Sequence, residues 1–184
     1  YHLRDWTFIQ DYPDVYRQWV KDRYERMIHS AKKEVIVETP YFLPGHMLRK
    51  ELMDAANRGV DVKVLVPYHS DVRVVDILRR HYLGMLYEAG VKFYFYIPGN
   101  LHAKSLMIDG ECFSISSANF DYRSFRYQYE IALIGSEPSI LKQLKTHHEY
   151  TIENSKGFDY ESWKQRPRFD KIMEYILFPF RYLM

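Results

Sequence analysis

The sequence predicts an α/β fold, in which helices cover both faces of a mixed, largely parallel sheet. Three observations predict it. Apolar residues alternate between helical and strand spacing along the chain, and one strand-like run is apolar on both faces, as in the middle of a covered sheet. The dipeptide Asp109-Gly110 separates two such runs, which is a strong hairpin signal. A chain of 184 residues, 47% hydrophobic and 27% charged, can bury a sizeable core and is not disordered as a whole.

The first elements follow from spacing and from residues that begin or end helices. Residues 13–28 predict a helix, because a proline suits its first turn and apolar residues then recur at helical spacing. Residues 34–39 (EVIVET) predict a strand rich in β-branched residues. After a proline-rich loop, a second helix is expected from about residue 47 and Gly59 can end it. Residues 61–67 (DVKVLVP) predict the next strand.

The same reasoning predicts the remaining helices and strands. Strands that alternate with helices favour a sheet with parallel pairs. The remaining expected elements are a helix over 71–89, a strand over 91–97, a hairpin of strands over 101–108 and 111–116, a strand over 130–134, a helix over 137–152 and a terminal amphipathic helix over 169–178.

Charge and cysteine content exclude several classes of protein. Lys and Arg number 26 against 24 Asp and Glu, which disfavours nucleic acid held by bulk charge. The single cysteine, Cys112, excludes an internal disulfide framework and a cysteine-cluster zinc site. The apolar runs are shorter than a membrane-spanning helix needs. Since the start has neither methionine nor a signal-peptide layout, we expect a piece of a longer protein.

The residues between 102 and 130 carry the candidate chemistry. His102 and Lys104 are two apart, so on a strand both side chains point to the same side. A cation beside an imidazole suits a phosphoryl group, because the cation neutralises the oxygens while the imidazole attacks phosphorus or moves a proton. Ser117 and Asn119 can donate hydrogen bonds to the same oxygens. Glu130 can accept from the second ring nitrogen of His102 and fix its tautomer.

Each of these residues also has a purely structural interpretation when it is taken singly. His102 can be a structural histidine near a strand, Lys104 a solvated charge at a strand edge, and Glu130 an exposed strand end. Ser117 and Asn119 can cap a turn. Their joint order is far more specific than any one of them.

That joint order resembles the phospholipase D superfamily. Residues 102–110 (HAKSLMIDG) match its HxKxxxxD signature, and residues 117–124 (SANFDYRS) with Glu130 resemble its GSANxDxRS...NxE segment. Residues 39–44 (TPYFLP) and several later stretches look like the second half of bacterial cardiolipin synthases. The likeness spans most of the chain from Trp19. Two positions depart from the pattern: Ser116 stands for a glycine and Gln128 for an asparagine.

The resemblance implies a role for each matching residue. It makes His102 a catalytic histidine, Lys104 and Asn119 ligands of the phosphate, Ser117 a further contact, and Glu130 the residue that orients His102.

Two further positions complete the expected site. Asp109 belongs to the catalytic signature, but its place at the hairpin turn predicts a structural or supporting task. Tyr41 is expected to line the substrate cleft, with packing as a loop aromatic as the alternative.

The resemblance also implies a mechanism that one motif copy cannot complete. One histidine displaces an alcohol to give a phosphohistidine, a second protonates the leaving oxygen, and another alcohol or water then attacks. Only His102 among the eight histidines is followed by lysine two residues later. An upstream half, which we favour, or a second identical chain must therefore complete the site, and the isolated piece is expected to be inactive. His102 is then expected to be the acid/base, with nucleophile as the alternative.

The predicted function is phosphatidyl transfer, in which two phosphatidylglycerols give cardiolipin and glycerol, with no cofactor and no metal. His147 and His148 are expected on a solvated or packed helix face. Alternatives are a phospholipase D-type phosphodiesterase or nuclease, and a non-catalytic phosphate-binding domain.

We expect residues 1–184 to be one phospholipase D-like domain with a helical tail from about residue 155. The terminal helix is expected to pack against the sheet, with lying on a membrane as the alternative. The phospholipid substrate predicts association with a membrane surface, the bacterial inner membrane, with any spanning segments upstream.

Overall fold

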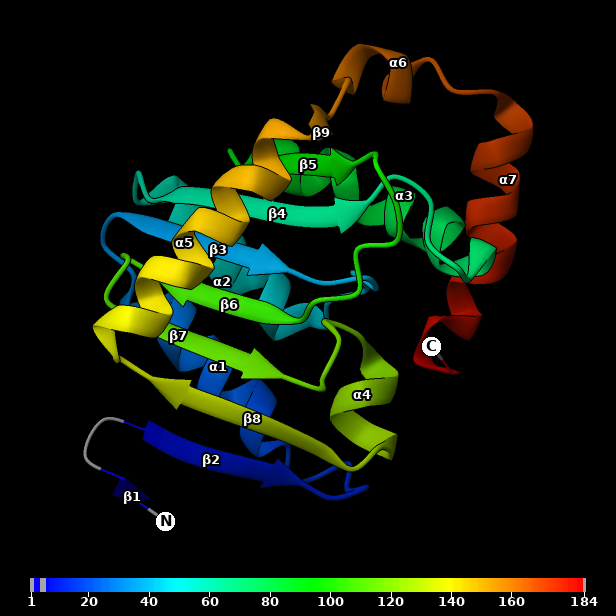
Figure 1. Ribbon diagram of the computed structural model, residues 1–184. Coiled ribbons are helices and arrows are strands. Elements are labelled where there is room, and N and C mark those ends of the chain that lie inside the picture. The colour runs from blue at the N-terminus through cyan, green and yellow to red at the C-terminus, as the bar shows by residue number, and fades with distance from the viewer. Residues whose placement is uncertain (1, 4–5, 184) are drawn as a thin grey trace.

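A single twisted sheet runs through the protein (Figure 1). The computed structural model describes residues 2–3 and 6–183, so positions 1, 4–5 and 184 of the predicted domain lie outside the described residues. Within that part of the chain the sheet has nine strands in the order β1-β2-β8-β7-β6-β3-β4-β5-β9. The strands are β1 (His2–Leu3), β2 (Trp6–Asp11), β3 (Glu34–Glu38), β4 (Asp61–Pro67), β5 (Lys92–Tyr96), β6 (Ser105–Ile108), β7 (Cys112–Ser116), β8 (Glu130–Gly135) and β9 (Ser155–Gly157).

The α/β class and the mixed sheet are confirmed, but among the described strands only β3-β4 and β4-β5 pair in parallel. The other described pairs are antiparallel, which corrects the expectation of a largely parallel sheet. The reason is connection length. Helices link β3 to β4 and β4 to β5, as parallel pairs require, whereas a tight turn links β6 to β7.

Helices cover both faces of the sheet, as predicted. In Figure 1, α5 crosses one face while α1, α2 and α3 lie behind the other. The larger apolar core lies on the α1–α3 side, and a smaller one lies beneath α5 around Leu144 and Met107. The helices are α1 (Trp19–Ser30), α2 (His46–Asn57), α3 (Arg73–Glu88), α4 (Tyr122–Tyr127), α5 (Pro138–Glu153), α6 (Tyr160–Lys164), α7 (Arg168–Leu177) and the 3₁₀ segment η1 (Phe178–Leu183).

The predicted hairpin at Asp109-Gly110 is confirmed between β6 and β7. Both turn residues have positive φ, 56° at Asp109 and 69° at Gly110. Such a turn matches the twist of the flanking strands, and aspartate and glycine tolerate this backbone conformation. The hairpin therefore sets the register of β6, the strand that follows His102 and Lys104.

Two element boundaries differ from the prediction by more than two residues. Helix α1 begins at Trp19 rather than near residue 13, because the Asp11 carboxylate accepts hydrogen bonds from the Trp19 and Val20 amides at 2.7 and 3.1 Å. Strand β6 begins at Ser105 rather than at residue 101, so His102 and Lys104 lie in the segment before it.

The segment from Ser155 begins with β9, which pairs with β5, and continues through α6 to α7. Helix α7 packs against α3 rather than against the sheet, which corrects the expected contact. An ion pair of 2.9 Å joins Arg80 on α3 to Asp170. None of the helices formed by the described residues combines the length and the apolar character needed to cross a membrane.

Candidate active site

His102 and Lys104 stand at the entrance to β6, between two buried anchors. Leu101 and Ser105 are both 5% exposed, and they hold the segment while the His102 ring is exposed and Lys104 is half-buried. The Lys104 ammonium donates to the His102 carbonyl at 2.9 Å. The two side chains are thus held in one short loop without the strand geometry that the sequence suggested.

Both residues open into one pocket of about 490 Å³. Ser117 lies on the same pocket, so the structure brings three of the predicted site residues together. The remaining lining residues are Glu38, Ala103, Ser105, Ile115, Ser116, Leu144 and His147.

Two opposing effects act on the pKa of the Lys104 ammonium. Burial lowers its pKa, whereas the carboxylates of Glu130, Asp121 and Asp71 raise it, and the net pKa lies below the usual lysine value. A bound anion would favour the charged form of the same group. The pocket therefore has a cation whose charge an anionic ligand stabilises.

Glu130 reaches the pocket through Ser117. Its carboxylate is buried at the start of β8 and accepts a hydrogen bond from the Ser117 hydroxyl, which in turn accepts from the Ile131 amide at 3.0 Å. Among the described residues no hydrogen bond joins Glu130 to His102. The glutamate thus fixes Ser117 directly.

Asn119 lies two residues beyond Ser117 with part of its side chain unsatisfied. Its Oδ1 atom is buried and accepts from no described residue, while its backbone amide donates to the Ser124 hydroxyl at 3.1 Å. Burial raises the pKa of Asp121 to about 6, although hydrogen bonds from Ser124 and Asn119 oppose the rise. Asp121 also caps α4, because its Oδ1 accepts from the Ser124 amide at 2.7 Å.

Tyr41 lies beside His102. The two rings meet edge to face with centroids 6.5 Å apart. The Tyr41 hydroxyl donates to Asp71 at 2.7 Å, and burial together with this bond raises its pKa to about 12. The loop that carries Tyr41 is tied to the Asn119 loop, since the Leu43 amide donates to the Phe120 carbonyl at 2.8 Å.

Asp109 lies at the opposite end of β6 from Lys104. Its carboxylate accepts from the backbone amides of Lys32, Lys33 and Glu34 at 2.7 to 3.2 Å. Burial raises the pKa of this carboxyl, but the three amides outweigh it and the net pKa lies below the usual value. Asp109 thus ties the hairpin to the start of β3, away from the pocket.

The two departures from the family pattern are accommodated locally. The Ser116 hydroxyl accepts a hydrogen bond of 2.8 Å from Tyr24 and lies 3.3 Å from the Ala118 carbonyl, to which it donates. Gln128 accepts from Ser124 at 3.4 Å.

The sequence reasoning missed Glu38 and His147 as pocket residues. Glu38 is fully buried, and His147 reaches it from α5 with Nε2 at 2.9 Å from Oε1. The available signal was Glu38, the second carboxylate of β3, which follows three apolar residues at the end of the strand opposite Glu34. Within the described parts of the chain, no group of three or more His, Cys, Asp or Glu side chains is arranged to hold a metal ion.

Comparison with known proteins gives matches over most of the chain. Residues 24–152 match the family model described as "Cardiolipin synthase, PLD-like domain". The major cardiolipin synthase ClsA of Bacillus subtilis is 35% identical over 162 residues, which are 88% of this chain and 34% of that protein. A cardiolipin synthase of Geobacillus kaustophilus is 39% identical over 156 residues, 84% of this chain and 31% of that protein. The chain spans about one third of the length of these relatives.

Solved structures share the fold at low sequence identity. Phosphatidylserine synthase of Haemophilus influenzae superposes with a TM-score of 0.79 at 13% identity, covering 97% of this chain and 48% of that one. The phospholipase D family member Nuc of Salmonella typhimurium gives a TM-score of 0.69 at 18% identity, covering 84% of this chain and 99% of that one.

Proposed function

Because the chain belongs to the family of phospholipase D-like domains of cardiolipin synthases, we propose that it forms one catalytic half of a phosphatidyltransferase. The reaction joins two phosphatidylglycerols into cardiolipin and releases glycerol. The observation that carries this proposal is the convergence of His102, Lys104 and Ser117 on one pocket. An imidazole, an ammonium and a hydroxyl around a cavity suit a phosphodiester.

The reaction proceeds in two displacements at phosphorus. A histidine nitrogen attacks the phosphorus of the first lipid, a P–N bond forms, and the P–O bond to the glycerol headgroup breaks. A second histidine, as imidazolium, gives its proton to the leaving oxygen, so glycerol departs neutral. The hydroxyl of the second phosphatidylglycerol then attacks the phosphohistidine, the P–N bond breaks, and the hydroxyl proton returns to the second histidine. In this scheme His102 is the acid/base.

The other site residues stabilise charge and hold positions. Lys104 and the Asn119 side chain bind the phosphoryl oxygens, where negative charge builds up in each transition state. Ser117, held by Glu130, supplies a further donor. Glu130 is proposed to orient His102 as well, once the substrate completes the site.

Two predicted residues take supporting roles. Tyr41 meets the His102 ring edge to face and is proposed to line the substrate cleft beside the 490 Å³ pocket, whose lining does not include it. Asp109 supports the site from a distance by fixing the hairpin that carries β6.

The nucleophilic histidine comes from a second HxK motif outside this chain. The one-third coverage of the cardiolipin synthase relatives supports an upstream half of the same polypeptide, and a second identical chain is the alternative. We propose that residues 1–184 form a single domain and that this piece is inactive alone. The complete protein works at a membrane surface, the bacterial inner membrane, with any spanning segments upstream.

The test is His102→Ala in the full-length protein, assayed with vesicles of pure phosphatidylglycerol and thin-layer analysis of the lipids. Loss of an acid/base group is expected to lower cardiolipin formation by roughly 10²- to 10⁴-fold. The exposed His69 provides the control, because His69→Ala leaves the pocket of His102 untouched. Full activity of His102→Ala would overturn the proposal in favour of a binding domain. Phosphatidic acid or cut DNA as the sole product would overturn the transferase.

A further inference from the structure

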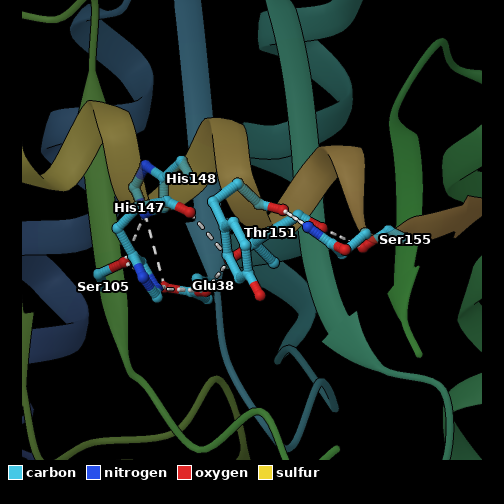
Figure 2. A network of polar contacts seen from close by, with 8 residues as sticks. Glu38, Ser105, His147, His148, Thr151 and Ser155 are labelled. Atoms are coloured by element: carbon cyan, nitrogen blue, oxygen red, sulfur yellow. Dashed lines mark hydrogen bonds and ion pairs between the residues drawn. The ribbon is translucent and has the colours of Figure 1, made fainter. Parts of the chain in front are cut away.

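A buried carboxylate lies beneath the active-site pocket. Glu38, at the end of β3, is 0% exposed, and side chains from two other elements, β6 and α5, contact it (Figure 2). Its oxygens accept hydrogen bonds from the Ser105 hydroxyl on β6 and the Thr151 hydroxyl on α5, each at 3.2 Å. The His147 ring, also on α5, places Nε2 at 2.9 and 3.0 Å from the two oxygens.

Two histidines are the ion-pair partners of Glu38 among the described residues. No lysine or arginine of the described residues lies within ion-pair distance of this carboxylate, whereas His147 and His148 do, at 2.9 and 3.6 Å. Burial lowers the pKa of His148 to about 4, which keeps that ring neutral. The hydrogen bond to Glu38 raises the pKa of His147 despite its partial burial. Of the two rings, His147 is therefore the one whose protonated form Glu38 stabilises.

His147 brings this charge to the pocket of His102 and Lys104. Its side chain is 44% exposed, and it lines the same 490 Å³ pocket from the α5 side. The pocket thus has two sources of positive charge, Lys104 from the segment before β6 and His147 from α5.

Resting on the proposed function, we propose that His147, positioned by Glu38, binds the phosphate of the accepting phospholipid. The second displacement requires two phosphates in the site at once, one on the phosphohistidine and one in the headgroup of the attacking lipid. Lys104 serves the first and the His147 imidazolium serves the second. Glu38 acts through His147 and is a positioning residue. Water needs no such contact, so the site favours transfer to an anionic lipid over hydrolysis.

A purely structural role for the cluster makes a different prediction. If Glu38 and His147 only clamp α5 onto β3 and β6, their loss should lower all activity in parallel with stability. An acceptor site instead changes how the phosphohistidine is shared between lipid and water. The ratio of cardiolipin to phosphatidic acid measures that sharing, and it is independent of how fast the intermediate forms.

The experiment compares His147→Gln with the wild-type full-length protein on pure phosphatidylglycerol vesicles. Glutamine keeps a hydrogen bond to Glu38 but carries no charge. The cardiolipin to phosphatidic acid ratio is expected to fall about tenfold, the size of one charge-assisted hydrogen bond. His29→Gln is the matched control, because His29 also pairs with a glutamate, Glu51 at 3.0 Å, but is absent from the pocket lining. That control should leave the ratio unchanged.

A second variant and a pH profile test whether the charge of the residue 147 side chain, rather than its shape, sets the product ratio. His147→Lys restores a cation and is expected to restore most of the ratio. In the wild type the ratio should fall as pH rises through the pKa of His147, whereas the lysine variant should stay flat. The titratable groups nearest His147 are Glu38 on β3, His148 on its own helix, and His102 and Lys104 around the pocket. The catalytic histidine serves both products, so its titration cancels in the ratio.

The outcomes distinguish this site from the function on which it rests. An unchanged ratio in His147→Gln, with headgroup release still dependent on His102, would overturn the acceptor site alone. A parallel fall of both products would overturn it in favour of a structural clamp. Headgroup release that survives His102→Ala would overturn the proposed function and the acceptor site together.

Discussion

The charged side chains at the two ends of strand β6 differ in how many hydrogen bonds they make within the protein. At the hairpin end, three backbone amides at 2.7 to 3.2 Å occupy the Asp109 carboxylate. At the other end, the exposed His102 ring makes no hydrogen bond to a described residue, and Lys104 donates only to the carbonyl of its own loop. All three residues belong to one sequence signature. Asp109 uses its hydrogen bonds to hold the fold together. His102 and Lys104 make few hydrogen bonds within the protein and are therefore available to bind a ligand.

Two aspartates show the same contrast in their pKa values. Backbone amides hold the pKa of Asp109 below its usual value, whereas burial raises the pKa of Asp121, near Lys104, to about 6. One carboxyl is stabilised as the anion and the other as the neutral acid. The pH dependence of stability should therefore have opposite signs at the two ends of β6.

The largest expected effect is loss of activity at the pocket end. Lys104→Met removes the cation beside His102 and should lower transfer in the full-length protein by roughly 10²- to 10³-fold, because charge on the phosphoryl oxygens loses its partner. Thermal unfolding should show little change. Lys50→Met is the control, since Lys50 pairs with Asp54 on the surface at 2.6 Å. Equal losses of activity in Lys104→Met and Lys50→Met would contradict a specific role for the cation beside His102.

The next largest effect is the contribution of Asp121 to the pH dependence of the free energy of unfolding. A rise in pKa from 3.8 to about 6 corresponds to about 3 kcal/mol at about 1.4 kcal/mol per unit. Because the folded-state pKa is raised, this stability is present below pH of about 4 and is lost as pH rises through about 6. Asp121→Asn should abolish that fall and keep the helix cap. Denaturant unfolding from pH 4 to 8 measures it, and identical slopes for both proteins would refute the burial effect.

The smallest effect is expected at the hairpin end. Asp109→Asn keeps a residue that tolerates positive φ but removes the charge that three amides bind, so it should cost about 1–3 kcal/mol of unfolding free energy at pH 7. Since the folded-state pKa is lowered, the difference from wild type is present above pH of about 4 and disappears as pH falls below it. Activity per folded molecule should be unchanged. A large loss of activity without a loss of stability would place Asp109 with the catalytic residues.

Elements with local apolar periodicity could be predicted from the sequence. The strands β3, β4 and β5 and the helix α5 carry β-branched or helical apolar spacing that depends only on neighbouring residues. The Asp109-Gly110 turn is equally local, because its backbone conformation depends on those two residues.

Elements that depend on distant partners were missed. Strand β2 exists because it pairs with β8, and its Asp11 sets the start of α1. The short helices α4 and α6 are held by capping aspartates and by packing rather than by an apolar period. Periodicity within a few residues contains no information about such contacts.

The same distinction between local and distant contacts applies to the candidate active site. The sequence by itself determined that His102, Lys104, Ser117 and Asn119 occur in the order typical of one phosphodiester chemistry. Only the tertiary structure decided that Glu38 and His147, which are 109 residues apart in the chain, meet beneath the same pocket. The physical reason is that hydrogen bonds between side chains depend on distance in space, which the packing of α5 across β3 and β6 sets.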